Sequence, residues 1–386
     1  MSDKVYERRF SEHHAFWVFF GILVLIFYVR IYFRLADADP RGIASAVWLV
    51  LCCIMTGLCF IARRTHIIES SLIRRWTDNI GSLWFLFVFY AFVIIVIFDA
   101  ARALLNFTLP ALTELSLSFA ASALFLACGV KQAFTIHTTK LTVETEKLPE
   151  DRDSLRIVQI TDLHLGPYCG VRLLEQILRR VSEAEPDMVV VTGDLADGRL
   201  DGRGHEITMF RQIRPSCGFF AVTGNHDYYD DIGKAVEFME HCGMRVLQTE
   251  AVCAGGIVVA GLDDRDHMIM ERWSLTRSET LIVNTHSKYR DKFLLVLRHR
   301  PIVELGTEGL FDLQLSGHTH GGQLFPLWTS RLFFGGHSRG FKKLRGGSML
   351  YTSNGAGYVG PPVRLFAPPE VVVIDLVKKV DTSAAK

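Results

Sequence analysis

The stretch GHTHGGQ, residues 317–323, follows the apolar run LQLS at residues 313–316 and is the starting point for interpreting this chain. Its two histidines, His318 and His320, are one residue apart, so an extended backbone would point both rings in the same direction. The paired glycines that follow allow the backbone to turn tightly or to approach a neighbouring segment. This arrangement suits a metal ion at the end of a strand, but an ordinary strand end can carry the same pair. The interpretation therefore depends on matching ligands elsewhere.

After residue 131 the chain alternates short apolar runs with helical segments, which is typical of an α/β domain. Residues 171–183, for example, place apolar side chains at helical spacing before Pro186 stops the helix. Six apolar runs predict strands at residues 155–160, 188–192, 219–223, 257–260, 294–297 and 313–316. They lead into TDLHLG, GDLADG, GNHDYY, GLDD, RHRP and GHTHGGQ. Because α/β folds assemble their sites beyond the carboxyl ends of strands, we expect these polar clusters to converge.

The converging side chains are of types that bind divalent metals: Asp162, His164, Asp194, Asn225, His226, His299, His318 and His320. Imidazole suits zinc, iron and manganese, whereas carboxylate and carboxamide oxygens suit manganese and magnesium. Cysteine is absent from the set, which argues against a structural zinc site. The set is too large for one ion, and two metals sharing a carboxylate would use it.

Five motifs in a fixed order carry a resemblance to a known family. They are DLH at Asp162–His164, GD at Gly193–Asp194, GNHD at Gly224–Asp227, the lone His299, and GHTH at Gly317–His320. Together they resemble the calcineurin-like metallophosphoesterases, over roughly residues 134–376. The segment LYTSNGAGYVGPPVRLFAPPEVVVIDL, residues 350–376, resembles a membrane-associated bacterial branch of that family. This branch includes phosphodiesterases and a UDP-2,3-diacylglucosamine hydrolase of lipid A synthesis.

The resemblance implies an α/β fold with four layers, α-β-β-α, in which two mixed sheets are sandwiched between helices. It also implies two divalent metal ions, with manganese as our first expectation and iron, zinc or magnesium as alternatives. The first metal would be held by Asp162, His164 and His320, the second by Asn225, His299 and His318, and both by a bridging Asp194.

The same resemblance implies a reaction in which a hydroxide held between the two metals attacks phosphorus. His226 would act as a catalytic acid or charge stabiliser, oriented by Asp227. Asp197 matches a further acid of the family motif. For the fourth motif we choose His299 over His286, because His299 follows a strand-like run and precedes Pro301, whereas His286 lies in a polar stretch.

The first 130 residues hold most of the apolar excess of a chain that is 49% hydrophobic, with a mean hydropathy of +0.23. Four apolar runs, Ala15–Phe33, Gly42–Ala62, Ile80–Phe98 and Leu115–Val130, are separated by arginine-rich connectors. They predict a transmembrane region of about four helices at residues 1–130. We expect a linker and first strand at residues 131–153, the catalytic domain at 154–378 and a disordered tail at 379–386.

Lysine and arginine are concentrated near residues 4–9, 63–75 and 131–147, which four spans would place on one side of the membrane. The positive-inside rule then puts both termini in the cytoplasm. Together with the resemblance to a bacterial branch, this leads us to expect a multi-pass protein of the bacterial inner membrane with a cytoplasmic catalytic domain. The scattered cysteines, without a C-x-x-C pair in that domain, agree with a reducing compartment. A net charge of +1 and a pI near 7.7 give no argument for a nucleic-acid partner.

Taken together, these features predict a membrane-anchored, metal-dependent phosphoesterase that hydrolyses a phosphodiester or pyrophosphate bond. Its expected partners are the lipid bilayer and a phosphoester substrate, with lipid-linked substrates such as UDP-2,3-diacylglucosamine in view. The alternative is a catalytically inactive membrane scaffold or sensor. A transporter is a weaker third hypothesis, since ionisable residues in the apolar runs are few and no internal repeat is evident.

Overall fold

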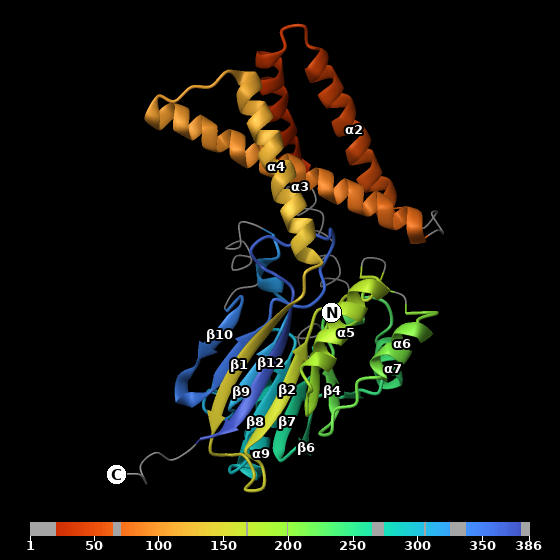
Figure 1. The fold of residues 1–386 in the computed structure, drawn as a ribbon, viewed down its shortest axis with the longest axis vertical. Coiled ribbons are helices and arrows are strands. Elements are labelled where there is room, and N and C mark those ends of the chain that lie inside the picture. Colours follow the sequence, from red (N-terminus) through yellow and green to blue (C-terminus); the bar gives the residue numbers. More distant parts are fainter. Residues whose placement is uncertain are drawn as a thin grey trace, which may run out of the picture. The chain divides into compact units, whose positions relative to one another are not determined.

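The computed structural model describes residues 21–64, 71–166, 169–198, 200–264, 274–304, 306–324 and 337–379. It divides into two compact units, Met1–Cys128 and Gly129–Lys386 (Figure 1). We had placed the corresponding boundary at residue 130. The tail that we expected at residues 379–386 lies, beyond Lys379, outside the described residues.

The N-terminal unit is helical in its described parts. Residues 21–38 form a helix, followed by α2 (Ile43–Arg64), α3 (Ser71–Leu105) and α4 (Ala111–Ala133), whose last residues belong to the second unit. Helices therefore cover the runs that we predicted, although the first run, Ala15–Phe33, lies partly outside the described residues. Two described helices, Asn79–Leu105 and Ala111–Ala133, are long and apolar enough to cross a membrane, and Ile43–Leu58 is a shorter apolar helix. The number of about four spans stays a prediction.

This unit contains a partly buried group of paired charges. Glu114 is fully buried and accepts hydrogen bonds from Arg34 Nη2 at 2.8 Å and from Arg102 Nη2 at 2.6 Å. Arg30 donates to Asp99 from Nε at 3.1 Å and from Nη2 at 2.6 Å. A charge in apolar surroundings is tolerated when it is paired and hydrogen-bonded, so these contacts fix the helix of residues 21–38 against α3 and α4.

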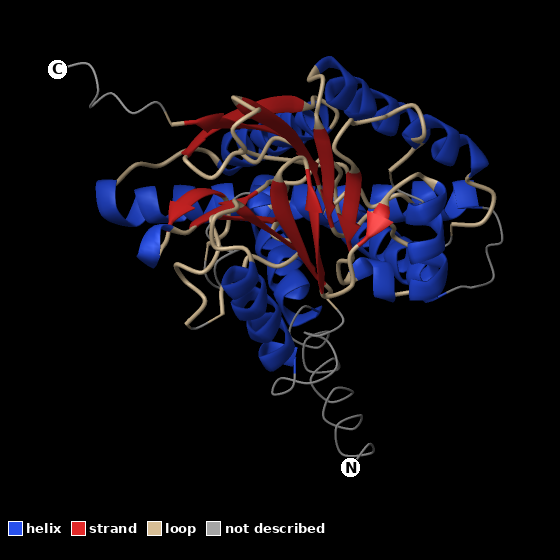
Figure 2. Ribbon diagram, turned by 90° about the horizontal axis from the view of Figure 1, so that it is seen from below, coloured by secondary structure: helices blue, strands red, loops and turns tan. Residues whose placement is uncertain are grey.

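The second unit contains two mixed six-stranded sheets (Figure 2). The first sheet has the order β1-β12-β2-β3-β4-β5, with β1 His137–Thr145, β12 Glu370–Lys378, β2 Ser154–Ile160, β3 Met188–Thr192, β4 Phe219–Val222 and β5 Arg245–Val246. The second has the order β10-β11-β9-β8-β7-β6, with β10 Gly340–Lys343, β11 Met349–Thr352, β9 Leu313–Ser316, β8 Leu294–Arg298, β7 Ile257–Leu262 and β6 Glu250–Ala254. All six predicted strands are present.

The alternation of side chains along each strand explains how the layers are held together. On β2, Ile157 belongs to the apolar core between the two sheets, while Val158 belongs to the core beneath the helices. Ile282 of α9 packs in the core on the outer face of the second sheet. The helices of this unit are α5 (Val171–Glu183), α6 (Gly204–Phe210), α7 (Ile232–His241) and α9 (Ser274–Lys288). The domain is thus an α/β fold with two mixed sheets between helices.

The parallel strands place the polar loops together. β2, β3 and β4 run parallel in the first sheet, and β7, β8 and β9 run parallel in the second. Gln159 Nε2 of β2 donates to the Ser316 carbonyl of β9 at 3.1 Å, so the carboxyl ends of the two sheets are adjacent. The loops that follow these strands consequently open onto one shared region.

Candidate metal centre

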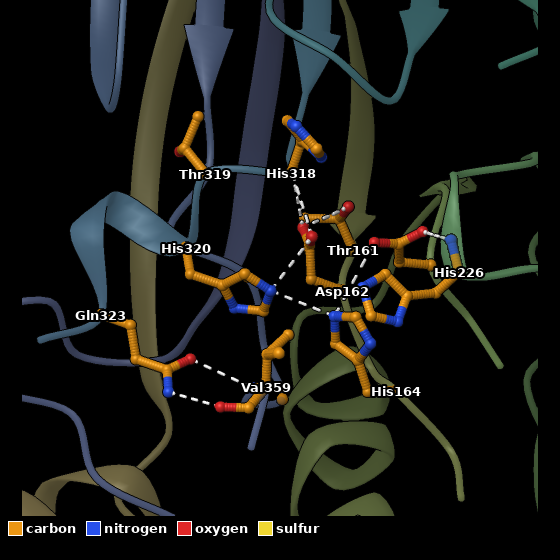
Figure 3. Close-up of polar contacts among 12 residues, drawn as sticks. Thr161, Asp162, His164, His226, His318, Thr319, His320, Gln323 and Val359 are labelled. Atoms are coloured by element: carbon orange, nitrogen blue, oxygen red, sulfur yellow. Dashed lines mark hydrogen bonds and ion pairs between the residues drawn. The ribbon is translucent and has the colours of Figure 1, made fainter. Parts of the chain in front are cut away.

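The seven residues that we expected to bind metal lie in loops that directly follow five strands. Asp162 and His164 follow β2, Asp194 follows β3, Asn225 follows β4, His299 follows β8, and His318 and His320 follow β9. The structure brings these loops together, and Figure 3 shows the side chains of part of the cluster pointing toward one another. His286, which we had set aside, lies on α9 instead.

The backbone of this region is strained. Five of the expected ligands have positive φ values: Asp162 (54°), His164 (49°), Asp194 (51°), His318 (72°) and His320 (49°). A left-handed conformation costs an L-residue about 1–2 kcal/mol, so it persists only where surrounding contacts impose it. The concentration of such residues here indicates that the loops are bent to aim their side chains inward.

A first group of possible metal ligands consists of Asp162, His164 and His320, all buried, with their ligand atoms within 4.8 Å of one another. The Nε2 atoms of the two histidines are 3.0 Å apart, and His320 Nε2 is 3.5 Å from Asp162 Oδ1. The backbone N–H of His318 donates to both Asp162 oxygens at 3.0 and 3.1 Å, which fixes the carboxylate. Two imidazole nitrogens and a carboxylate oxygen thus face one point.

A second group consists of Asp194, His299 and His318. His299 Nε2 lies 3.1 Å from Asp194 Oδ2 and 3.2 Å from His318 Nδ1. The other ring nitrogen of His299, Nδ1, is 2.9 Å from the Thr192 carbonyl. A proton on Nδ1 would be donated there, which leaves the Nε2 lone pair directed into the group, as in most histidines that bind metals.

Asp194 faces both groups. Its Oδ2 atom, which contacts His299, is also 3.8 Å from His164 Nε2. Burial acts to raise the pKa of Asp194, but the imidazoles of His299 and His164 hold it well below its usual range. An ionised carboxylate shared by two imidazole groups is the arrangement that a bridging ligand requires.

Asn225 supplies a further test of whether a metal fits. Its Nδ2 donates to the Tyr229 hydroxyl at 3.2 Å, whereas its Oδ1 is buried and has no hydrogen-bond partner among the described residues. A buried carboxamide oxygen without a donor costs about 1–3 kcal/mol. A cation would remove that cost, and carboxamide oxygens are suitable ligands for hard divalent ions. The donor set therefore fits a pair of divalent metals.

The contacts of Asp227 differ from our expectation that it orients His226. Its carboxylate accepts hydrogen bonds from the backbone N–H groups of Gly224 (2.8 Å), Asp194 (3.0 Å) and Ala196 (2.9 Å). Burial and the neighbouring Asp194 raise the pKa of Asp227 to about 7. Asp227 thus ties together the loops that follow β3 and β4.

Asp197 is the acid that lies beside His226. Its Oδ1 is 3.3 Å from His226 Nδ1, and its Oδ2 is 3.6 Å from His164 Nδ1. The His226 ring also packs against the ring of Tyr229, with centroids 4.3 Å apart. The family motif contained Asp197, but the sequence could not show which acid meets the imidazole, because that depends on how the two loops pack.

Glycine is required at two points of the GHTHGGQ loop. A Cβ atom on Gly317 would collide with the side chains of Asp162 and Thr161. Gly321 has φ +59°, and a Cβ atom there would collide with Asn354. The glycines therefore allow this loop to lie directly against its neighbours, as the sequence suggested.

Arg364 is a member of the site that sequence reasoning missed. Its side chain is fully buried, and its Nη2 lies 2.9 Å from His320 Nδ1. The same guanidinium donates to the carbonyls of Asn354 (2.6 Å), Gly357 (3.1 Å) and His320 (3.2 Å). Burial lowers the pKa of Arg364 to about 10. It therefore links the C-terminal segment to the ring of an expected ligand.

Glu370 supports the same segment. It is buried and accepts hydrogen bonds from the backbone N–H of Asn354 at 2.8 Å, Ser353 Oγ at 3.0 Å and the Tyr351 hydroxyl at 3.1 Å. The loop that follows β11 reaches the first ligand group, since Gly357 N donates to the Asp162 carbonyl at 2.9 Å. Both charged residues lie in the segment VRLFAPPE, whose resemblance to a family branch was the only signal for them in the sequence.

Replacing Asp194 tests the shared carboxylate. Asp194→Asn keeps the size of the side chain but removes the charge that faces both imidazole groups, so we expect bound divalent metal to fall below about one tenth of the wild-type amount. Metal content of the purified protein, measured by inductively coupled plasma mass spectrometry, checks this. Asp375→Asn on β12, which pairs with Arg156, serves as control. Wild-type metal content in the Asp194 variant would refute the bridging role.

Replacing Arg364 tests the support behind His320. Arg364→Lys keeps a positive charge but cannot hold the carbonyls of Asn354, Gly357 and His320 together, so the loop that carries His320 loses support and we expect metal affinity to fall about 10- to 100-fold. Metal titration followed by calorimetry measures the affinity, and circular dichroism verifies that the variant is folded. Arg339→Lys is the matched control, because Arg339 donates to the Phe366 carbonyl of the same segment without contacting His320. Equal affinities in the two variants would contradict the expectation.

Comparison with known proteins supports the same conclusion as the geometry. The family model described as calcineurin-like phosphoesterase matches residues 155–322. An uncharacterized metallophosphoesterase of Aquifex aeolicus is 36% identical over 248 residues, which cover 64% of this chain and 93% of that protein. A second one, Cj0846 of Campylobacter jejuni, is 32% identical over 70% of this chain and 71% of its own length.

A third relative comes from an animal. The transmembrane protein with metallophosphoesterase domain of Danio rerio is 30% identical, over 61% of this chain and 56% of its own length. The Aquifex match spans nearly the whole relative, and the family model ends within the GHTHGGQ loop. This chain therefore belongs to the calcineurin-like metallophosphoesterase family.

Proposed function

We propose that this protein is a membrane-anchored phosphoesterase that uses two divalent metal ions to hydrolyse a phosphodiester or pyrophosphate bond. The observation that carries the proposal is the Asp194 carboxylate, whose Oδ2 lies 3.8 Å from His164 of the first ligand group and 3.1 Å from His299 of the second. We favour manganese, with iron, zinc or magnesium as alternatives. Among substrates we favour lipid-linked ones such as UDP-2,3-diacylglucosamine.

The charges of the site favour an anionic substrate. Of the seven proposed ligands, only Asp162 and Asp194 carry a negative charge, so two divalent ions would leave the centre with a net positive charge. When bound, such ions supply an activated water molecule and stabilise the charge on phosphoryl oxygens. The protein itself contributes the positions of the proposed ligands, which the strained loops hold in a largely buried site.

His226 has the position of a proton donor rather than that of a purely structural residue. Its side chain is 17% exposed, whereas those of His164 and His299 are fully buried, so it lies where the site meets solvent. Asp197 holds its Nδ1 at 3.3 Å, and the exposed Tyr229 packs against its ring. An imidazole held in this way can protonate a leaving-group oxygen.

The membrane part of the proposal has two supports. Two described helices are long and apolar enough to cross a bilayer, and a relative is named a transmembrane protein. If the protein has four spans, the distribution of lysine and arginine favours a catalytic domain in the cytoplasm, and we propose the bacterial inner membrane as its location. A site attached to a bilayer would meet lipid-linked phosphoesters readily. The alternative of an inactive scaffold is not favoured, because a degenerate site usually lacks ligands and this one has all seven.

The activity test uses the full-length protein in detergent with bis-p-nitrophenyl phosphate and each candidate metal. We expect hydrolysis by the wild type, and a fall of about 10²- to 10⁴-fold in kcat for His226→Ala with metal content retained. His286→Ala, on α9, is the control and should behave as wild type. No turnover with any divalent metal would refute the proposal, and full activity of the His226 variant would refute the role of that residue.

The topology test uses Cys253, which is exposed on β6 of the catalytic domain. If that domain is cytoplasmic, a membrane-impermeant maleimide should label Cys253 only after spheroplasts expressing the full chain are lysed. The label is identified by mass spectrometry of the peptide, and Cys253→Ser is the negative control. Labelling of Cys253 in intact spheroplasts would place the domain on the other side.

A further inference from the structure

Two arginines flank His299 in the sequence LRHRP, and the structure gives them different surroundings. Arg298 Nη1 donates to Glu304 Oε1 at 2.6 Å and to the Ile302 carbonyl at 3.1 Å, and both side chains of the ion pair are largely buried. Arg298 therefore stabilises the loop after β8. Arg300, by contrast, lies at the metal centre.

The guanidinium of Arg300 is held from one side by a buried acid. Its Nε donates to Asp264 Oδ1 at 2.9 Å and its Nη2 to Asp264 Oδ2 at 3.3 Å. The Asp264 side chain is 3% exposed and that of Arg300 is 21% exposed, so the acid is fixed inside while the arginine reaches solvent. Two hydrogen bonds to one carboxylate hold the guanidinium in one orientation and leave its third nitrogen, Nη1, available to another group.

The remaining nitrogen, Nη1, lies 3.4 Å from His318 Nε2. His318 Nδ1 is directed at His299 Nε2, at 3.2 Å, so Nδ1 is the atom on the metal side of the ring. A neutral imidazole that binds metal through Nδ1 carries its proton on Nε2. Arg300 then meets an N–H group instead of an acceptor, and its Nη1 keeps the capacity to donate to an anion.

The charge of Arg300 also needs an explanation. A guanidinium next to a metal-binding histidine repels the metal, and the repulsion is strongest in a partly buried site. Asp264 offsets this charge at Nε and Nη2 but not at Nη1. An anionic group at Nη1 would offset the rest. Only the imidazole of His318 lies between Nη1 and the metal side, so an anion at Nη1 would be one side chain away from a phosphate held at the metals.

We propose that Arg300, oriented by Asp264, binds a second phosphate adjacent to the one that is hydrolysed, and that the enzyme thereby selects pyrophosphate diesters over simple phosphodiesters. This inference rests on the proposed function. It names the class of substrate and assigns a specificity-determining residue that the ligand set does not include.

The test compares two substrates with the full-length protein: bis-p-nitrophenyl phosphate, with one phosphate, and a nucleoside diphosphate sugar, with two. We expect Arg300→Gln to raise KM for the nucleoside diphosphate sugar about 10- to 100-fold, the usual effect of losing a charged hydrogen bond. The loss in kcat/KM should be at least tenfold larger than for bis-p-nitrophenyl phosphate, and metal content should stay at the wild-type value. The sugar nucleotide should also lose potency as an inhibitor of bis-p-nitrophenyl phosphate hydrolysis.

Two further variants sharpen the experiment. Asp264→Asn should shift specificity in the same direction by a smaller factor, because it releases the guanidinium without removing it. Arg290→Gln makes the same change of charge at an exposed position before β8, at the opposite end of that strand from the site, and should match wild type on both substrates. Equal losses of Arg300→Gln on both substrates, no loss, or loss of metal would overturn this inference alone. A wild type that hydrolyses neither substrate would overturn the proposed function and this inference with it.

Discussion

The carboxylate of Asp194, placed between imidazoles from two groups, is the interaction on which the candidate site depends. Its Oδ2 atom faces His299 at 3.1 Å and His164 at 3.8 Å. Each ligand group takes residues from both sheets, since Asp162, His164 and Asp194 follow strands of the first sheet, and His299, His318 and His320 follow strands of the second. The centre therefore exists only when the two sheets pack face to face, and the apolar core between them is a condition for the chemistry.

Buried polar residues outside the proposed ligand set keep the loops in their strained shapes. The carboxylate of Asp227 accepts hydrogen bonds from three backbone N–H groups in the loops after β3 and β4. The guanidinium of Arg364 donates hydrogen bonds to backbone carbonyls around His320. A buried charge is stable only when its hydrogen bonds are satisfied, so each of these residues imposes a defined backbone path. The left-handed backbone conformations of five proposed ligands cost conformational free energy, and these hydrogen bonds offset that cost.

The arrangement is also consistent with the anionic substrate that we propose. His226, Tyr229 and Arg300 are more exposed than the buried ligands. Asp197 lies 3.3 Å from His226 Nδ1, and Asp264 accepts hydrogen bonds from Arg300, whose Nη1 stays beside His318. In our proposal, recognition of phosphate and positioning of the metals belong to different residues.

Hydrophobic periodicity and residue type determined much of this protein from the sequence alone. The apolar runs predicted the strands that carry the site, and the parallel α/β rule predicted that Asp162, His164, Asp194, Asn225, His299, His318 and His320 would converge. The sequence could not show that Asp227 binds backbone while Asp197 meets His226, nor that Arg298 is buried while Arg300 lies at the site. Nor did it indicate that Arg364, 44 positions after His320, contacts that ring. Strand position follows from local pattern, whereas side-chain partners depend on loop conformation and on packing between distant segments, so only the tertiary structure decided them.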